Sequence, residues 1–461
     1  MQRIIKPIWA FIFVLILVRL ISLGAYPLLD TTEARYGEIA RIMLETQNWI
    51  TPQFDYGVPF WGKPPLHTWA SAISASILGV SEFSLRLPHL LAGAFTLFVL
   101  SILAKGLQLN AKVVVLLTCS MLGFYASSGM VMTDAFLLLG ITLALGGFAL
   151  TWAHTTKVYA YIGFIGLGIG LLAKGPITIV LIGLVIVPWL GLNYGVKKGL
   201  CELVRRIPVL SGLILMLAVS LPWYVLAERA TPGFFNYFIV GEHWLRFVQS
   251  GWEGDLYGTA HSEPRGIIWL YWVLIAFPWS IYLSVILTLK KNRIALKEAS
   301  KADNWTSYFV LWLISPMILF TFSGNILAIY VLPGIPALAL LIARIHTQIT
   351  RPMILISLIT PVLLVVFLFA EIPDLIERKS DKGLVESVKQ TYPIYAVNKP
   401  SFSSRFYTQG KIKTLTSILD LKALNKPAYI IVPNNVKNAQ ALKSSCTLQS
   451  QNALKALFLC P

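Results

Sequence analysis

The sequence predicts an all-α polytopic membrane bundle of about eleven transmembrane helices (range eleven to thirteen), followed by a small C-terminal α/β domain. Hydrophobic residues make up 56% of the 461 residues and charged residues only 13%, whereas soluble proteins have about 25% charged residues. Apolar runs that can cross a hydrocarbon core of about 30 Å recur along most of the chain. The composition changes after residue 370, which predicts a membrane domain over 1–370 and an exported α/β domain over 371–461.

The predicted crossings follow the apolar runs, and the segment 66–80 is either a further span or lies in the membrane interface. Eleven crossings place the basic connections on one side, as expected where Lys and Arg are retained in the cytoplasm. The net charge of +17 is therefore assigned to topology, and no nucleic-acid partner is expected. The predicted spans are 8–29, 87–104, 112–130, 133–152, 158–173, 176–194, 208–226, 266–289, 306–323, 326–344 and 352–370.

The segments predicted to face outside differ in character from short connecting turns. They include a large first loop over 30–86, which contains interfacial helices, a second loop over 227–265, and the tail. Long irregular loops rich in aromatic and charged residues usually carry function. In the tail, the strand-like runs PIYAV and AYIIVP alternate with the helix-like runs SILDLKALN and NVKNAQALK. If the tail is exported, Cys446 and Cys460 can form a disulfide.

The first loop begins with DTTEARYGEIAR, residues 30–41. Asp30 followed by Glu33 matches the start of a helix with Asp30 as its N-cap. The residues that follow have one apolar and one charged face, which predicts a helix that lies on the membrane. Two acids and Arg35 also cluster at the depth of a lipid head group. The stretch therefore predicts either a helix cap alone or part of an active site, and its spacing does not choose between them.

Lys63 lies in the segment FWGKPPL, residues 60–66. The double Pro restricts the backbone, because each Pro sets its own φ and biases the residue before it. A fixed ammonium group beside aromatic rings near the head-group layer suits a phosphate. The alternative is a Lys that only extends to the membrane interface.

Two isolated charges stand at predicted outside turns. Asp134, in MVMTDAFLLLG, lies between two apolar segments, and acids at a membrane boundary are functional candidates by default. Thr133 and Asp134 could also simply cap the following helix. Lys174, in LLAKGPIT, lies at a predicted outside turn, although basic residues are normally retained on the cytoplasmic side. Asp134 and Lys174 are therefore candidate site residues.

The segment EHWLRF in the second loop places Glu242, His243 and Arg246 on one helical face. His243 and His261 with nearby acids could hold a divalent metal, but no tight ligand spacing is present. Neither a metal site nor a required cofactor is therefore predicted. The sequence has no Walker lysine loop, GxSxG motif or CxxC pair, which removes the corresponding ATPase, hydrolase and thiol-redox classes.

The order of these motifs resembles that of the polyprenyl-phosphate-sugar-dependent glycosyltransferases of the GT-C superfamily. This family includes protein O-mannosyltransferases and the aminoarabinose transferases of lipid A. The resemblance covers roughly residues 5–345 and is most specific over 30–66. It implies a site on the outside face, with one acid in the first outside loop and a second acid, matched by Asp134, in the outside turn near 131–134. The residues assigned or proposed for contact with the donor's phosphate are Arg35, Tyr36, Lys63, Lys174, His243, Arg246 and Tyr330.

The first-loop motif departs from the family pattern. Relatives commonly have an Asp-Glu pair before x-Arg-Tyr, whereas this chain has Thr32 and Glu33. The reacting acid of this loop is therefore either Asp30 or Glu33, and the motif does not separate them.

The resemblance implies an integral-membrane glycosyltransferase that moves a sugar from a polyprenyl-phosphate donor to lipid A, another glycolipid or a protein. We also expect inversion without a required metal, at the periplasmic face of a bacterial inner membrane, in a monomer whose other partner is membrane lipid. Two other classes are retained: a secondary transporter or flippase of a lipid-linked glycan, and a ligase or polymerase of such glycans. Transporters tend to have repeats and broken helices at the midplane, whereas this chain concentrates its polar residues in outside loops.

Overall fold

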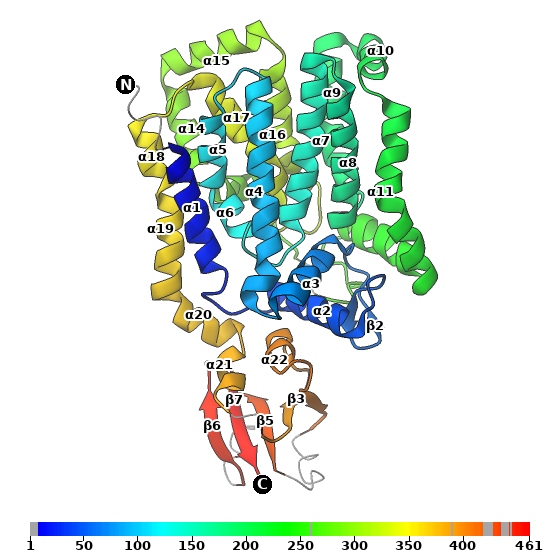
Figure 1. Ribbon diagram of the computed structural model, residues 1–461, viewed down its shortest axis with the longest axis vertical. Helices are drawn as coiled ribbons and strands as arrows, with labels where there is room; N and C mark the ends of the chain where they lie inside the picture. The colour runs from blue at the N-terminus through cyan, green and yellow to red at the C-terminus, as the bar shows by residue number, and fades with distance from the viewer. Residues whose placement is uncertain (1–7, 259–260, 389–390, 418–426, 435–441, 443–444) are drawn as a thin grey trace.

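The computed structural model describes residues 8–258, 261–388, 391–417, 427–434, 442 and 445–461, apart from the side chains of 371–374. Figure 1 shows a bundle of long helices, with two shorter helices, α2 (Thr32–Thr46) and α3 (Leu66–Leu78), across one end. A small sheet lies beyond them. The predicted helical membrane bundle with a small C-terminal sheet is confirmed at this level.

Seven described helical segments are long and apolar enough to cross a membrane, judged by length and composition, and an eighth is bent. The bundle also contains two shorter apolar helices, α1 (Ile8–Ser22) and α16 (Trp305–Thr321). The number of crossings, predicted as eleven, stays a prediction. The long segments are α4 (Glu82–Gly106), α7 (Asp134–His154), α8 (Lys157–Lys174), α9 (Ile177–Tyr194), α11 (Val209–Ala230), η3 with α17 (Ala328–Gly334, Ile335–Ile345), and Arg351–Ala370, which contains α18 (Arg351–Ser357), α19 (Ile359–Val366) and most of η4 (Phe367–Glu371).

Three predicted spans are not single straight helices. Residues 112–130 form α5 (Ala111–Cys119) and α6 (Leu122–Ser127), and residues 266–289 form α13 (Ile267–Ile275) and α14 (Trp279–Thr288), which are bent by 98°. The two breaks meet, because the Leu122 amide donates to the Phe277 carbonyl at 2.8 Å. Backbone groups freed inside a bundle must find such partners. The third, 326–344, starts as a 3₁₀ turn that contains Pro333, which cannot donate a backbone hydrogen bond.

Helices α7 and α8 approach closely because glycines face each other along their contact. A Cβ on Gly140 would lie 2.7 Å from the Gly166 carbonyl, and one on Gly147 would lie 2.4 Å from the Tyr159 carbonyl. Small residues allow this close packing of helices in membranes. Since the two helices run in opposite directions, the first residue of α7 and the last residue of α8 lie at the same end of the bundle.

The first loop forms α2, the strands β1 (Gln53–Asp55) and β2 (Val58–Pro59), and α3. The 13-residue α3 lies beside α2 across the end of the bundle (Figure 1), which agrees with an interfacial segment. The N-cap of α2 is Thr31, without a side-chain cap hydrogen bond, so the predicted cap by Asp30 is wrong. The charged face of α2 is only partly open to solvent: Glu38 and Arg41 are buried and joined by an ion pair of 2.7 Å, whereas Glu45 is exposed.

The opposite end of the bundle carries two further helices, α10 (Val196–Arg206) and α15 (Lys290–Ala302), as Figure 1 shows. The second long loop contains η2 (Asn236–Leu245) and α12 (Arg246–Val248). The wider π-helical turn of η2 replaces the regular helix that was predicted around EHWLRF.

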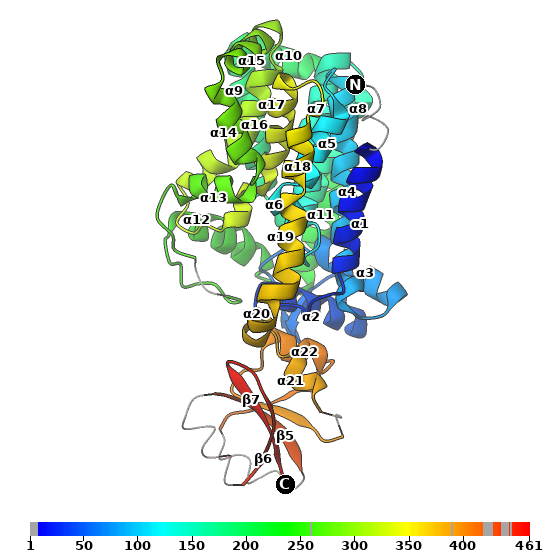
Figure 2. The ribbon, with the colours of Figure 1, turned by 90° about the vertical axis from the view of Figure 1, so that its left-hand side faces the viewer.

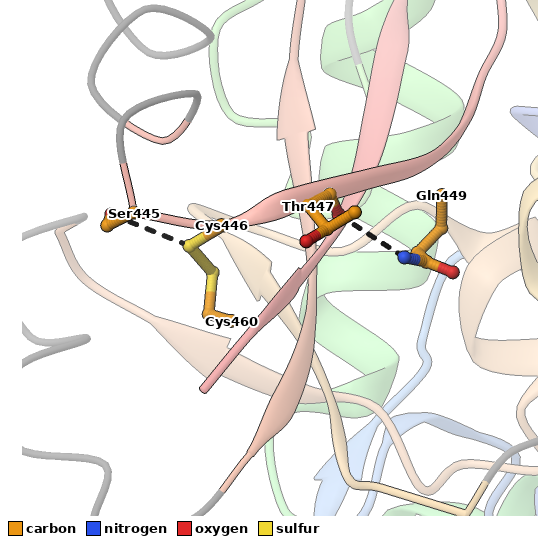
Figure 3. Close-up of a disulfide and its surroundings, with 5 residues drawn as sticks. All are labelled: Ser445, Cys446, Thr447, Gln449 and Cys460. Carbon is orange, nitrogen blue, oxygen red and sulfur yellow. Dashed lines mark hydrogen bonds between the residues drawn. A yellow bond between two sulfur atoms is a disulfide. The ribbon is translucent and has the colours of Figure 1, made fainter.

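The C-terminal part is a five-stranded mixed sheet in the order β4-β3-β5-β7-β6. Strand β3 is parallel to β4 and β5, and β7 is antiparallel to β5 and β6. Cys446 and Cys460 form the expected disulfide (Figure 3). The helix-like runs predicted here fall mainly on 418–426 and 435–441, outside the described residues. The strands are β3 (Ile394–Val397), β4 (Lys413–Leu415), β5 (Ala428–Pro433), β6 (Thr447–Gln451) and β7 (Lys455–Cys460).

Three helices join this sheet to the bundle: α20 (Ile372–Lys379), α21 (Lys382–Glu386) and α22 (Phe402–Tyr407). Figures 1 and 2 both show α22 next to α2. The Lys382 ammonium group lies 2.7 Å from the Glu82 carboxylate, and Tyr407 accepts a hydrogen bond from the Leu28 amide at 2.8 Å. The C-terminal part is therefore held against the first loop by charged and polar contacts.

Candidate active site

A cavity of about 330 Å³ lies where the first loop, the second loop and the ends of α7 and α8 meet, and we call it the polar cavity. Eight of the residues that the sequence proposes as catalytic or phosphate-binding line it, although they come from separate segments. The side chains of Asp30 and Glu33 do not line it. The eight are Arg35, Tyr36, Lys63, Asp134, Lys174, His243, Arg246 and Tyr330.

Asp134 and Lys174 form an ion pair at the wall of the polar cavity. The Lys174 ammonium group lies 2.6 Å from Asp134 Oδ1 and 4.7 Å from the centre of the Tyr330 ring. Asp134 is the first residue of α7 and Lys174 the last of α8. An acid at a helix N-terminus and a base at a C-terminus are both favoured by the helix dipole. The close contact of α7 and α8 therefore brings the pair together.

Glu242 joins two other cations of the polar cavity. Its carboxylate lies 2.8 Å from the Lys63 ammonium group and 3.1 Å from the Arg246 guanidinium. Arg246 is also 2.9 Å from Asp255. Burial alone would raise the pKa of Glu242, but Lys63 and Arg246 outweigh burial and lower that pKa to about 2. Glu242 is therefore ionised at neutral pH and holds Lys63 in a fixed position.

The variant Glu242→Gln is expected to lose a stabilisation that depends on pH. The folded-state pKa of Glu242 lies below its usual 4.5, so the contribution is fully present above pH 4.5 and is lost as the pH falls towards 2. The lowering of the Glu242 pKa corresponds to roughly 3 kcal/mol of the free energy of unfolding at neutral pH. Thermal unfolding in detergent should show a large deficit for the variant at pH 7 that shrinks below pH 4.

Glu253→Gln is the matched control for this measurement, because Glu253 lies in the same loop but is exposed. The unfolding temperature of Glu253→Gln should match that of the wild type at pH 7 and at pH 3. An equal deficit of Glu242→Gln at pH 7 and pH 3 would contradict the role given to the ion pair.

His243 lines the cavity as a neutral ring. Burial lowers the pKa of its imidazole, and Lys63 lowers it further. Nδ1 lies 2.8 Å from the Phe238 carbonyl oxygen, and Nε2 lies 3.2 Å from the Lys174 carbonyl oxygen. A neutral imidazole carries one N–H, so His243 supplies no positive charge for a phosphate. It packs against Gly175, where a Cβ would lie 3.0 Å from Nε2.

Arg35 differs from the other cations of the polar cavity. Lys63, Lys174 and Arg246 each face a carboxylate, whereas Arg35 has no ion pair within the described part of the chain. Its Nη1 donates to the Tyr257 carbonyl at 2.6 Å, and its Nε is buried without a hydrogen-bond partner in the described residues. Buried donors are rarely left unsatisfied. Arg35 therefore offers a charge and a donor to an anionic ligand.

The two acids between which the sequence left the reacting role open have other partners. Glu33 is 2% exposed and lies 2.8 Å from the Arg86 guanidinium. It also accepts a hydrogen bond from the Val131 amide at 3.2 Å. Asp30 accepts hydrogen bonds from the amide and the hydroxyl of Ser403 in α22. Burial raises the pKa of Asp30 more than these bonds lower it. Neither carboxylate faces the polar cavity.

Thr32, the departure from the family pattern, does line the polar cavity together with Thr31. The position where relatives commonly have an acid thus presents a hydroxyl-bearing residue. Among the acids of the first loop and the α7 turn that were proposed from the sequence, only Asp134 reaches the cavity.

Asp255, Tyr257 and Phe402 are cavity residues that no motif in the sequence singles out. Asp255 is the second partner of Arg246, Tyr257 binds Arg35 through its carbonyl, and Phe402 reaches the cavity from α22. Asp255 and Tyr257 stand in GWEGDLYG, whose density of Gly, acids and aromatic residues was a signal of function, although not of a particular contact. Phe402 is 370 residues from Thr32 in the chain, and nothing near it in the sequence indicates that it lines the cavity.

Metal ligation was considered for His243, His261 and nearby acids. Among the described residues, no group of three or more His, Cys, Asp or Glu side chains is placed to hold a metal ion. The acids of the cavity are engaged by Lys and Arg instead.

The fold and the polar cavity define a polytopic membrane protein with a charged site at one end of its helical bundle. The chain belongs to the dolichyl-phosphate-mannose-protein mannosyltransferase family, whose model matches residues 6–238, just over half of the chain. This membership agrees with the resemblance that the motifs indicated.

The chain is also similar in sequence to individual transferases. The chain is 27% identical over 345 residues to the undecaprenyl phosphate-alpha-4-amino-4-deoxy-L-arabinose arabinosyl transferase of Yersinia pestis, and 28% identical over 346 residues to that of an Enterobacter species. Each match covers 72% of this chain but only 58% of the relative. The chain thus spans little more than half the length of these relatives.

Solved structures share the fold. ArnT from Cupriavidus metallidurans bound to undecaprenyl phosphate superimposes with a TM-score of 0.77 at 18% identity, over 98% of this chain and 97% of that one. The oligosaccharyltransferase AglB from Archaeoglobus fulgidus superimposes with a TM-score of 0.50 at 10% identity, over 92% of this chain and 69% of AglB.

Proposed function

We propose that the chain is an integral-membrane glycosyltransferase that moves a sugar from a polyprenyl-phosphate donor to an acceptor at the polar cavity. The observation that carries the proposal is Arg35, a half-buried cation without a carboxylate partner in the described chain, which lines the polar cavity together with Lys63. A phosphate ester supplies the missing negative charge and hydrogen-bond acceptor. Family membership and the activity for which the relatives are named support the same substrate class.

The proposed reaction is a direct displacement with inversion. The acceptor oxygen forms a bond to the anomeric carbon, and the bond from that carbon to the donor's phosphate oxygen breaks. The electron pair remains on the departing polyprenyl phosphate, where Arg35 and Lys63 stabilise the charge. An acceptor hydroxyl gives its proton to Asp134, which Lys174 holds in place. If the acceptor is a phosphate, no proton moves and Asp134 only positions it.

The proposal places the protein in a bacterial inner membrane with eleven crossings. The basic helices α10 and α15 at one end of the bundle (Figure 1) then face the cytoplasm. The polar cavity and the C-terminal part face the periplasm, where lipid A, another glycolipid or a protein is the acceptor. The protein acts as a monomer and needs no divalent metal, so transfer should persist in EDTA.

Incubation of protein-containing membranes with a donor radiolabelled in the sugar tests the proposal. Transfer releases free polyprenyl phosphate and labels the acceptor in equal amounts. Movement of intact donor across the membrane without release would instead identify a transporter or flippase. A product linked through pyrophosphate would identify a ligase or polymerase.

The variant Asp30→Asn is expected to retain transfer within about threefold of the wild type, because an amide can still bond both groups of Ser403. Asp134→Asn is the contrasting variant, and loss of a general base lowers rates by about 10²–10⁴-fold. Initial rates in membranes with equal amounts of protein give the comparison. An inactive but folded Asp30→Asn would return the reacting role to Asp30.

A further inference from the structure

Helix α10 has the features of a helix that lies in a membrane surface. Four of its eleven residues are basic and one is acidic. Val196, Leu200 and Val204 recur every fourth residue and are 82%, 60% and 62% exposed, so they form one apolar stripe on the outside of the protein. Lys197 and Lys198 are also exposed, and neither has an ion pair within the described residues. An apolar stripe beside free cations is typical of contact with anionic lipids.

An apolar groove of about 220 Å³ lies next to this helix. It is lined by Phe148 and Trp152 of α7, Phe164 of α8, Ile182 of α9, Leu203 of α10 and Ile207. Aliphatic and aromatic side chains form nearly the whole lining, so the groove suits a hydrocarbon chain.

Cationic groups stand where α10 lines the groove. The Arg206 guanidinium lies 4.9 Å from the centre of the Trp152 ring and donates to the Trp152 carbonyl at 3.1 Å. Arg205 and Arg206 share Glu202, at 2.6 and 2.9 Å. Two guanidinium groups thus share one carboxylate, and the two lysines add uncompensated charge.

We propose that α10 and this groove bind an anionic glycerophospholipid, with an acyl chain in the groove and the phosphate head group against Lys197, Lys198 and Arg205. The apolar lining selects a hydrocarbon chain, and the surplus of positive charge selects an anionic head group over a zwitterionic one. Helix α10, which carries the cationic end of the site, lies at the end of the bundle opposite α2 (Figure 1). No residue lines both the groove and the polar cavity, so the proposal does not depend on the proposed sugar transfer.

Filling the groove tests the acyl-chain part of the proposal. Gly183 of α9 lines the groove, and a Cβ there meets no atom within 4 Å. Gly183→Leu therefore adds bulk to the groove, and its Cβ does not clash with any neighbouring atom. Gly191, on the same helix, also has open space around its Cβ but does not line the groove, so Gly191→Leu is the matched control.

Native mass spectrometry of the detergent-purified full chain, titrated with phosphatidylglycerol or phosphatidylcholine, measures the binding. The wild type should bind one phosphatidylglycerol at least tenfold more tightly than phosphatidylcholine. Gly183→Leu should weaken phosphatidylglycerol binding about tenfold, the effect of about 1.4 kcal/mol, and Gly191→Leu should leave it unchanged. Equal binding by both variants, or preferential retention of a polyprenyl phosphate in the groove, would overturn the proposal.

Removing charge tests the head-group part. The triple variant Lys197→Gln/Lys198→Gln/Arg205→Gln should bind phosphatidylglycerol on the order of a hundredfold more weakly, since each basic residue near a membrane surface contributes about fivefold. The control Lys290→Gln/Lys297→Gln/Lys301→Gln removes three exposed charges from α15 at the same end of the bundle. It should change binding by less than threefold. A similar loss in both variants would reduce the site to general charge attraction and overturn the proposal.

Discussion

Replacing Lys63 by Ala should lower the rate of sugar transfer by about 10²–10³-fold, the usual effect of removing one group that stabilises charge in a transition state. The Lys63 ammonium group is held by Glu242 and by the Gly62 carbonyl, and it faces the polar cavity beside Arg35. It needs little reorganisation to meet the charge that develops on the departing phosphate. The measurement is the initial rate in membranes that contain equal amounts of each variant.

Lys382→Ala is the matched control for this prediction. Lys382 also pairs with a Glu carboxylate, Glu82 at 2.7 Å, and is similarly exposed, but it lies outside the polar cavity. It should transfer sugar at the wild-type rate. If Lys63→Ala kept activity within threefold of Lys382→Ala, the leaving-group role of Lys63 would be abandoned.

The second large effect concerns stability. Glu33→Ala should destabilise the protein by roughly 3–5 kcal/mol, because it leaves a buried Arg86 without its counter-charge. Arg86 is fully buried, and besides its pair with Glu33 it donates to the carbonyls of Leu23, Tyr26 and Pro27. Its guanidinium also lies 3.7 Å from the centre of the Tyr26 ring, and no second carboxylate pairs with it among the described residues. The variant should appear as a loss of folded protein in detergent, with a lowered unfolding temperature.

The double variant Glu33→Leu/Arg86→Met separates this structural role from a catalytic one. Replacing both members of a buried pair by apolar residues is often neutral or stabilising, so the double variant should recover much of the lost stability. It should also retain measurable transfer, because Asp134 and Lys63 are unchanged. A folded double variant without any activity would show that Glu33 takes part in the reaction itself.

The sequence predicts the general fold well because transmembrane segments are long, apolar and separated by charged connections. It fails where a tertiary contact replaces a local signal. The break between α5 and α6 is one example, because its backbone is satisfied by Phe277, far along the chain. The burial of Glu38 and Arg41 is another, since their part of the charged face of α2 is covered by neighbours that periodicity does not reveal.

For the site, the sequence marks single residues but not their pairs. Asp134 and Lys174 are each conspicuous as charges at the ends of apolar segments, yet their contact follows from the glycines that bring α7 and α8 together. Asp30 and Glu33 are equally conspicuous, and only the structure shows that Ser403 and Arg86 hold them. Asp30 lies 373 residues from Ser403, a distance at which no spacing argument applies.

The central claim is that the donor's head group binds in the polar cavity. A polyprenyl-phosphate sugar with a photoreactive group on the sugar tests it directly, by mapping the labelled peptides of the full chain. The label should appear on peptides that line the cavity around Lys63, Asp134 and Tyr257, should be suppressed by unlabelled polyprenyl phosphate, and should fall in Lys63→Ala. Labelling confined to other parts of the bundle, or labelling that polyprenyl phosphate does not suppress, would contradict the claim.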